Sequence, residues 1–219
     1  MVIGDEDGDG VRELAVLAIR VSDLRTYVQI KNIAGADNTR SIVFSTDLTP
    51  MRLKDLGDSD GNGVTDLAVL AVRETDLRAV VEIRNAFGEA LKRTVQFEAL
   101  ASPLDMDVLV DPLGIDPPRI TVMMFRWPDG LTPGRGFLDS RNATGPLNRI
   151  RVNLRPATSP VAVKIIDEGG TKAAPLWIRE SDGRTLVEVK NIVGSGANSF
   201  QFYNGLNTAL GVTSAGDAD

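Results

Sequence analysis

The chain has 219 residues, with 24 Lys and Arg against 30 Asp and Glu, and a formal net charge of −6. It contains no histidine and no cysteine, which excludes Ser-His-Asp and Cys-His nucleophiles, zinc sites with thiolate or imidazole ligands, and disulfides. Because nucleic-acid binding needs clustered Lys and Arg, and a membrane helix needs ~20 apolar residues in a row, neither nucleic-acid binding nor membrane insertion is expected. Any bound metal would have oxygen ligands, as calcium and magnesium prefer.

A repeat of 53 residues organises the chain. Arginines at positions 20, 73, 126 and 179 are spaced 53 residues apart, and each is followed three residues later by an aspartate. A basic-Asn-x-x-Gly segment also occurs four times, with one copy four residues late because of an insertion. We expect repeats over 4–56, 57–109, 110–165 and 166–215, with 216–219 as the start of a fifth.

Each repeat is expected to contain four short strands. In the first repeat they cover 13–20, 25–32, 39–45 and 49–56, and in the second 66–73, 78–85, 92–99 and 103–110. Val28 and Ile30 alternate with Tyr27 and Gln29, which is the period of a half-buried strand. The run over 14–19 is apolar on both sides, which predicts a strand covered on both faces; a helix is the alternative, but six residues favour a strand.

The segments between these strands carry turn signals. Arg-x-x-Asp lies at the first hairpin tip and Asn-x-x-Gly at the second, while Ser or Thr followed by Pro opens the last strand. A four-stranded sheet cannot bury both faces alone, and stacking such sheets around an axis does so. The sequence therefore predicts an all-β fold, a β-propeller of four-stranded antiparallel blades, with residues 1–219 as one propeller domain or a segment of one. A row of small sandwiches and a β-solenoid are the alternatives.

Two acidic loops are the strongest candidate site. Oxygen-bearing side chains fall at positions 1, 3, 5 and 9, glycine at position 6, and a backbone carbonyl is available at position 7, which is a spacing that wraps a loop around one hard cation. The predicted calcium ligands are Asp5, Asp7, Asp9, Val11 and Glu13 in the first loop, and Asp58, Asp60, Asn62, Val64 and Asp66 in the second. An EF-hand needs Glu at position 12 and a following helix, whereas Val16 and Val69 stand there.

Glu13-Leu14-Ala15-Val16 and Asp66-Leu67-Ala68-Val69 follow these loops. This pattern resembles the calcium loops of FG-GAP and VCBS-type β-propellers, the family that includes the integrin α-subunit head. The resemblance implies that each loop joins the first and second strands of a blade, so that the strands at Pro50 and Pro103 begin the next blade.

The third and fourth loops depart from the motif. Repeat three has Arg119 at position 9, which would repel a cation. In repeat four Asp167 aligns with position 1 and Pro175 with position 9, and we expect Lys172 to supply the positive charge that calcium supplies elsewhere.

The end of the chain repeats the beginning. Residues 216–219 match 4–7 in register, so Asp217 and Asp219 are predicted ligands of a fifth loop. A terminal strand over 208–216 could complete the first repeat in a closed ring or pair with another chain. We favour a segment of a longer propeller, because in a closed ring the Asp-x-Asp at 5–7 and the one at 217–219 would compete for the same loop position.

These features predict a non-catalytic, calcium-stabilised propeller that acts as an extracellular binding, adhesion or structural module. Its ligand would be a protein or a carbohydrate, and its location secreted or on the cell surface, with a signal peptide removed. One alternative is a propeller-type glycosidase or lyase that uses paired carboxylates, for which Asp105, Asp107, Asp139 and Glu180 are candidates. The other is a self-assembling filament or surface-layer subunit that associates through its unpaired terminal strand.

Overall fold

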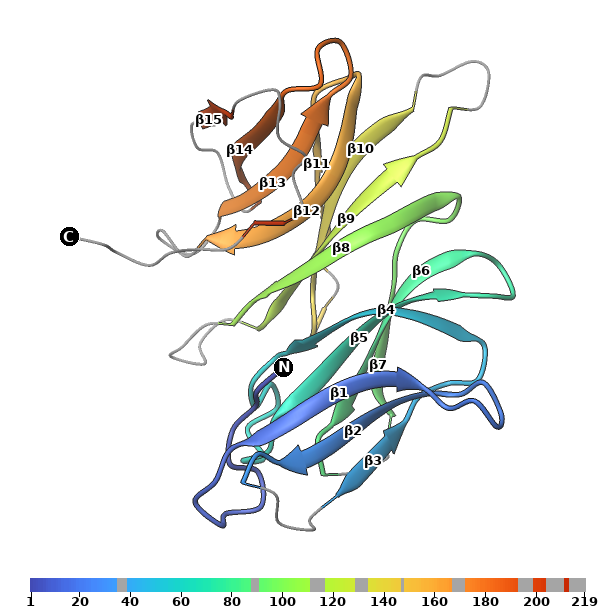
Figure 1. Ribbon diagram of the computed structural model, residues 1–219, viewed down its shortest axis with the longest axis vertical. Helices are drawn as coiled ribbons and strands as arrows, with labels where there is room; N and C mark the ends of the chain where they lie inside the picture. Colours follow the sequence, from blue (N-terminus) through green and yellow to red (C-terminus); the bar gives the residue numbers. More distant parts are fainter. Residues whose placement is uncertain are drawn as a thin grey trace, which may run out of the picture. The chain divides into compact units, whose positions relative to one another are not determined.

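The computed structural model describes residues 1–34, 39–87, 91–110, 117–128, 134–146, 148–166, 172–192, 199–203 and 211–212. Within these ranges the protein is all-β, with fifteen strands in four antiparallel sheets and no helix (Figure 1). The described part of the chain therefore contains no helix that could span a lipid bilayer. The contacts divide into two compact units, and each is described by itself.

The first unit contains two sheets. It comprises Met1–Ala99, Pro112–Pro118 and Ala143–Gly145. One sheet has the order β1-β2-β3, with β1 (Glu13–Ile19), β2 (Thr26–Asn32) and β3 (Arg40–Val43). The other has the order β4-β5-β6-β7, with β4 (Leu48–Asp55), β5 (Asp66–Arg73), β6 (Arg78–Asn85) and β7 (Leu91–Gln96). An isolated bridge between Val2 and Leu14 adds a short fourth element beside β1.

The second unit also contains two sheets. It comprises Leu100–Asp111, Arg119–Asn142 and Pro146–Asp219. The first has the order β8-β9-β10-β11, with β8 (Ala101–Leu109), β9 (Arg119–Arg126), β10 (Arg135–Asn142) and β11 (Ile150–Asn153). The second has the order β12-β13-β14-β15, with β12 (Thr158–Ile166), β13 (Lys172–Arg179), β14 (Thr185–Asn191) and β15 (Ser199–Phe202).

The proline-bearing strands begin sheets, as the resemblance implied. β4 pairs with β5 and not with β3 in the described sheets, and β8 and β12 likewise pair with the strand that follows them. A register shift lies directly beside Pro50, Pro103 and Pro160. Because proline cannot donate a ladder hydrogen bond, it is tolerated at such an irregularity of an edge strand. Each sheet is thus offset from the sequence repeat by one strand.

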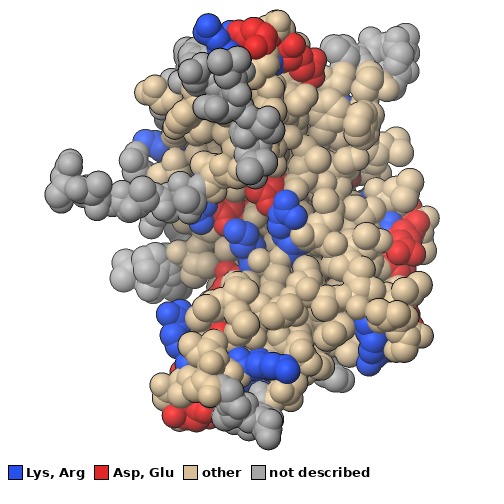
Figure 2. Space-filling view, viewed as in Figure 1, with Lys and Arg blue, Asp and Glu red and all other residues tan. Residues whose placement is uncertain are grey.

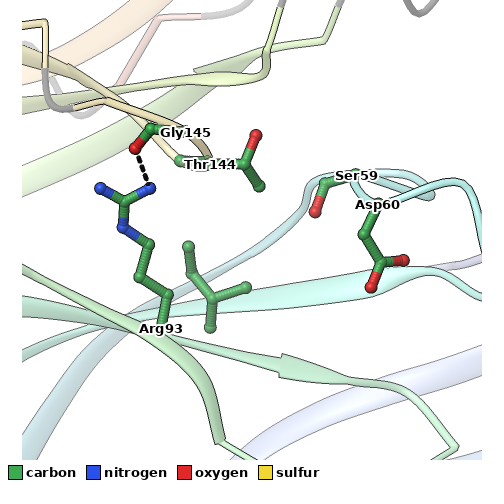
Figure 3. Close-up of a pocket in the computed structure, with 7 residues that line it drawn as sticks. Ser59, Asp60, Arg93, Thr144 and Gly145 are labelled. Carbon is green, nitrogen blue, oxygen red and sulfur yellow. Dashed lines mark hydrogen bonds between the residues drawn. The ribbon is translucent and has the colours of Figure 1, made fainter.

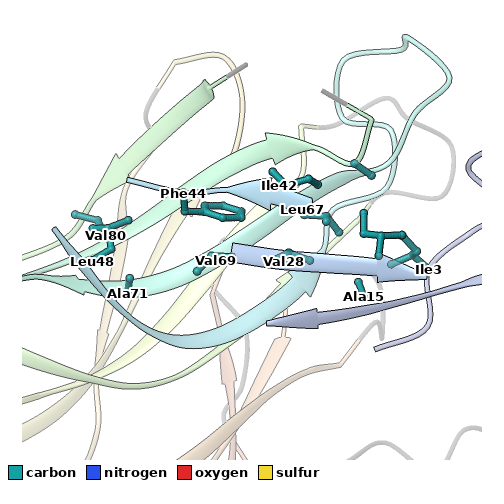
Figure 4. Packing of buried hydrophobic residues seen from close by; sticks show 12 residues of the cluster. Ile3, Ala15, Val28, Ile42, Phe44, Leu48, Leu67, Val69, Ala71 and Val80 are labelled. Carbon is teal, nitrogen blue, oxygen red and sulfur yellow. The ribbon is translucent and has the colours of Figure 1, made fainter. Parts of the chain in front are cut away.

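Successive sheets within a unit pack face to face. In the first unit, Leu67, Val69 and Ala71 of β5 share one buried cluster with Ala15 and Val28 of the preceding sheet (Figure 4). The second unit repeats this arrangement, because Ala173 and Trp177 of β13 cluster with Met123 and Leu138 of the sheet before them. The core of each unit therefore lies between its two sheets.

The two apolar strands that look alike in sequence differ in burial. The expectation that both faces are covered is confirmed for β5, in which the adjacent residues Val69 and Leu70, which point to opposite faces, are both 0% exposed. It is wrong for β1, where Leu14 is 39% and Val16 48% exposed. Within the described part of the first unit, only one face of the β1–β3 sheet packs on another sheet, whereas alternating side chains of a strand point to opposite faces.

The Arg-x-x-Asp pairs close three hairpin tips, as predicted. Arg20, Arg73 and Arg179 each make a two-pronged ion pair with the aspartate three residues later, and that aspartate also accepts a hydrogen bond from the backbone N–H two residues further on. The Arg179 guanidinium lowers the pKa of Asp182 to about 2. Asp129, the aspartate of the third repeat, lies outside the described residues.

The residue after each aspartate adopts a left-handed backbone conformation, with φ of 56° at Leu24, 52° at Leu77 and 68° at Gly183. Leucine pays a steric cost there that glycine avoids. We expect Leu77→Gly to stabilise the protein by about 0.5–1 kcal/mol, measured by urea denaturation. Gly183→Ala is the matched control: an added Cβ meets no atom within 4 Å, so its expected destabilisation reports backbone strain alone. A loss of stability in Leu77→Gly would contradict this assignment.

Candidate cation-binding loops

Both acidic loops have the same backbone turn. Glycines at positions 4 and 6 have left-handed φ angles, 75° and 87° at Gly8 and Gly10, and 77° and 83° at Gly61 and Gly63. The glycine at position 6 was expected from the loop spacing, whereas the glycine at position 4 was not. L-residues rarely adopt these angles, so both glycines are required for the chain to turn back on itself.

The side chain of the first aspartate in each loop stabilises this turn by accepting hydrogen bonds from backbone N–H groups of the same loop. Asp5 accepts hydrogen bonds from the backbone N–H groups of Gly8 and Gly10, at 2.9 and 2.8 Å. Asp58 accepts bonds, at 2.9 and 2.7 Å, from the backbone N–H groups of Asn62 and Gly63, which stand at loop positions 5 and 6. The bond from Gly63 is the main reason that the pKa of Asp58 is lowered, so this side chain is held as a carboxylate.

Three predicted ligands of the first loop come together. Ligand oxygens of Asp5, Asp7 and Glu13 lie within 4.8 Å of one another. Asp5 is exposed and Glu13 is fully buried. The Oε1 atom of Glu13 is buried and has no hydrogen bond within the described part of the chain, while its Oε2 atom accepts one from the Glu6 backbone N–H at 2.8 Å. The group thus combines the fixed, buried carboxylate of Glu13 with the more exposed carboxylates of Asp5 and Asp7.

The remaining predicted ligands of the first loop are Asp9 and Val11. The Asp9 carboxylate accepts hydrogen bonds from the Asn32 side chain at 2.6 Å and from the Val11 backbone N–H at 2.8 Å. Asn32, the asparagine of the basic-Asn-x-x-Gly segment, also accepts a bond from the Ala34 N–H. This asparagine therefore ties the turn after β2 to the acidic loop.

The second loop has the same turn but a looser set of acids. Asp66 is fully buried at the start of β5 and accepts a hydrogen bond from the Ser59 hydroxyl. Asn62 accepts a bond from the backbone N–H of Val64, at 2.9 Å. Asp58, Asp60 and Asp66 do not come as close to one another as the three acids of the first loop, which are the single such group among the described residues.

A cavity of about 320 Å³ lies beside the second loop (Figure 3). Arg93 of β7 donates a hydrogen bond to the Gly145 carbonyl oxygen at 2.7 Å, across from Ser59 and Asp60. The residues that line it all belong to the first unit, and they are Ser59, Asp60, Ile83, Arg93, Ala143, Thr144 and Gly145.

Strand register corrects the alignment of repeat four. Glu13 and Asp66 are paired with Asn32 and Asn85, and in the later sheets Arg119 is paired with Asn142 and Lys172 with Asn191. Position 9 of repeat four is therefore Lys172 and not Pro175, which lies inside β13. Arg119 stands at position 9 of repeat three, as predicted, and is buried. The segments 111–116 and 167–171 lie outside the described residues, as do Asp217 and Asp219.

The structure also contains a set of buried ion pairs that the repeat pattern did not predict. The acid and base lie two residues apart on one strand, with Glu82–Arg84 at 2.5 Å, Asp139–Arg141 at 3.0 Å and Glu188–Lys190 at 2.8 Å. Two of these acids also contact the segment that joins their sheet to the preceding one, since Glu82 accepts a hydrogen bond from the Ser45 N–H and Glu188 lies 3.6 Å from Arg155. The signal was an acid two residues before each Arg-Asn or Lys-Asn, and the first repeat has Gln29 instead.

The carboxylates considered for catalysis have structural partners. Asp107 lies 3.0 Å from Lys164, and Asp139 lies 2.9 Å from Arg149. Asp105 accepts a hydrogen bond from the Val163 N–H, and Glu180 one from the Ser159 hydroxyl. On the face shown in Figure 2, basic and acidic side chains lie next to one another rather than in extended patches of one sign.

Comparison with known proteins gave no match to a protein family, to a curated protein or to a solved structure. The described structure and the repeat define the class, which is an all-β repeat protein with two glycine-hinged acidic loops.

Proposed function

We propose that this chain is a non-catalytic, calcium-stabilised β-propeller, or a segment of one, that serves as an extracellular binding, adhesion or structural module. The observation that carries the proposal is the buried Glu13 carboxylate, grouped within 4.8 Å with ligand oxygens of Asp5 and Asp7. Three carboxylates at this separation repel one another, and a divalent cation among them turns that repulsion into attraction.

Calcium suits the chemistry of both loops. The donors are carboxylate, amide and backbone oxygens, which calcium accepts in flexible numbers, whereas zinc prefers nitrogen and sulfur. If the loops bind, Asp5, Asp7, Asp9 and Glu13 hold one ion, with the Val11 carbonyl, and Asp58, Asp60, Asn62 and Asp66 hold the other, with the Val64 carbonyl. Extracellular calcium is high enough for sites with dissociation constants of about 10⁻⁴–10⁻³ M.

The propeller part of the proposal is supported by how the sheets stack. Both units place one face of a sheet on the opposite face of the sheet before it, with the same repeat positions in contact. A stacking rule that is the same at every step is what a propeller needs to arrange its blades around one axis. Because the candidate catalytic acids are bound in ion pairs and in hydrogen bonds to backbone or side-chain groups, a binding or structural role is the better supported one.

Isothermal titration with calcium chloride tests the proposal. We expect two ions per chain for the wild type, and one ion for each of Glu13→Gln and Asp66→Asn, because each change removes the buried carboxylate of one loop. Asp23→Asn is the matched control, since Asp23 is an acid paired with Arg20 at a hairpin tip, and it should still bind two ions. The absence of binding, or equal losses in all three variants, would contradict the proposal.

A further inference from the structure

The Arg40 side chain of β3 contacts both Glu13 of the first acidic loop and Phe87, which follows β6. Its Nη2 atom is 3.5 Å from Glu13 Oε1, and its guanidinium lies 3.9 Å above the centre of the Phe87 ring. All three guanidinium nitrogens are buried, and none has a hydrogen-bond partner among the described residues. The contact with Glu13 is therefore an ion pair without hydrogen-bond geometry.

A guanidinium in this position needs a nearby negative charge. Burial of an ionised group is strongly unfavourable unless an opposite charge compensates it, and Glu13 is the acid with which Arg40 is paired among the described residues. The reverse also holds, because the other contact described for the Glu13 carboxylate is the neutral backbone N–H of Glu6. The buried ends of Arg40 and Glu13 thus compensate each other's charge.

Comparison of the four repeats supports this pairing. The equivalent position in each sheet is given by its partner on the neighbouring strand, and the four pairs are Arg40 with Ile30, Arg93 with Ile83, Ile150 with Ser140, and Ser199 with Val189. Arginine occurs in the two repeats that have Glu13 or Asp66 at loop position 9. The two repeats with a basic residue at position 9, Arg119 or Lys172, have an uncharged residue instead. The charges at the two positions therefore change together.

We propose that Arg40 is a positioning residue of the first loop, which acts as the counter-ion of Glu13 in the cation-free chain and competes with calcium for this carboxylate. The second half rests on the proposed function. Two cations that share one buried carboxylate repel each other, so Arg40 stabilises the loop without calcium and lowers its calcium affinity. The positive charge of Arg40 thereby limits how much the stability of the first sheet depends on bound calcium.

A double-mutant cycle in EDTA tests the first half without calcium. Arg40→Met keeps the alkyl packing but leaves Glu13 buried without its counter-ion, so we expect Tm to fall. Arg40→Lys keeps the positive charge, so its Tm should stay close to that of the wild type. Adding Glu13→Gln to Arg40→Met should recover stability, because the neutral amide needs no counter-ion. If the Tm changes of Arg40→Met and Glu13→Gln simply added in the double variant, the pairing of the two residues would be overturned.

Calcium titration tests the second half. In a background carrying Asp60→Ala, which leaves the first loop as the site to be measured, Arg40→Met should raise calcium affinity about tenfold, while Arg40→Lys should leave it unchanged. An unchanged or weaker affinity in Arg40→Met would overturn the competition. If the wild type binds no calcium, the proposed function fails, whereas the cycle in EDTA still decides the role of Arg40.

Discussion

Replacement of Asp60 by alanine is expected to lower Tm by about 5–10 °C in calcium and to leave it nearly unchanged in EDTA. A ligand at a hundredfold excess over its dissociation constant adds about 2.7 kcal/mol to the stability of the folded state, and 1 kcal/mol shifts Tm by roughly 2–4 °C for a chain of this size. Asp60 is exposed, so its loss removes a ligand without opening a cavity. Differential scanning calorimetry in both media measures the effect.

Asp76→Ala provides the control for this result. Asp76 is also exposed, and its partner is Arg73 at a hairpin tip rather than a cation. Its replacement should change Tm by the same small amount in calcium and in EDTA. If Asp60→Ala behaved like Asp76→Ala, the second loop would be a charged turn and not a calcium site.

Truncation of Leu67 is expected to destabilise the first unit by about 3 kcal/mol. Leu67 is 0% exposed, in the cluster between the β1–β3 and β4–β7 sheets, and a Leu→Ala change at a buried position costs about 2–5 kcal/mol through lost burial and an unfilled cavity. Urea denaturation followed by near-UV circular dichroism measures the loss.

Leu14→Ala is the matched control one repeat earlier. The two leucines follow the same loop motif, but Leu14 is 39% exposed, so its truncation should cost less than about 1 kcal/mol. Equal effects of the two changes would show that the outer face of β1 is covered in solution.

The strands were predictable because their signals are local. In the first two repeats the alternation of Val28 and Ile30 with polar neighbours, and the turn residues on either side, placed strands to within a few residues of the observed bounds. The loop turns were predictable for the same reason, since Gly10 and Gly63 mark a backbone conformation that glycine alone adopts easily. The 53-residue spacing then transferred each assignment from one repeat to the next.

The candidate site was predictable only as a set of residues. The spacing of Asp5, Asp7 and Glu13 predicted that their oxygens can meet, and the structure brings them together. It did not predict that the acids of the second loop lie further apart, or that Arg40 faces Glu13 from another strand. Those contacts depend on how β3 and the next sheet pack, which no local pattern specifies.

The sequence by itself determined the repeat, the strands, the turns and the acidic loops, because each depends on residues that are neighbours along the chain. The tertiary structure decided which equivalent residues differ, as Leu14 and Leu67 do in exposure, and which charges are buried together, as Glu82 and Arg84 are. The physical reason is that burial and charge compensation depend on what the next sheet places against a residue, and two repeats with the same local sequence can have different neighbours in space.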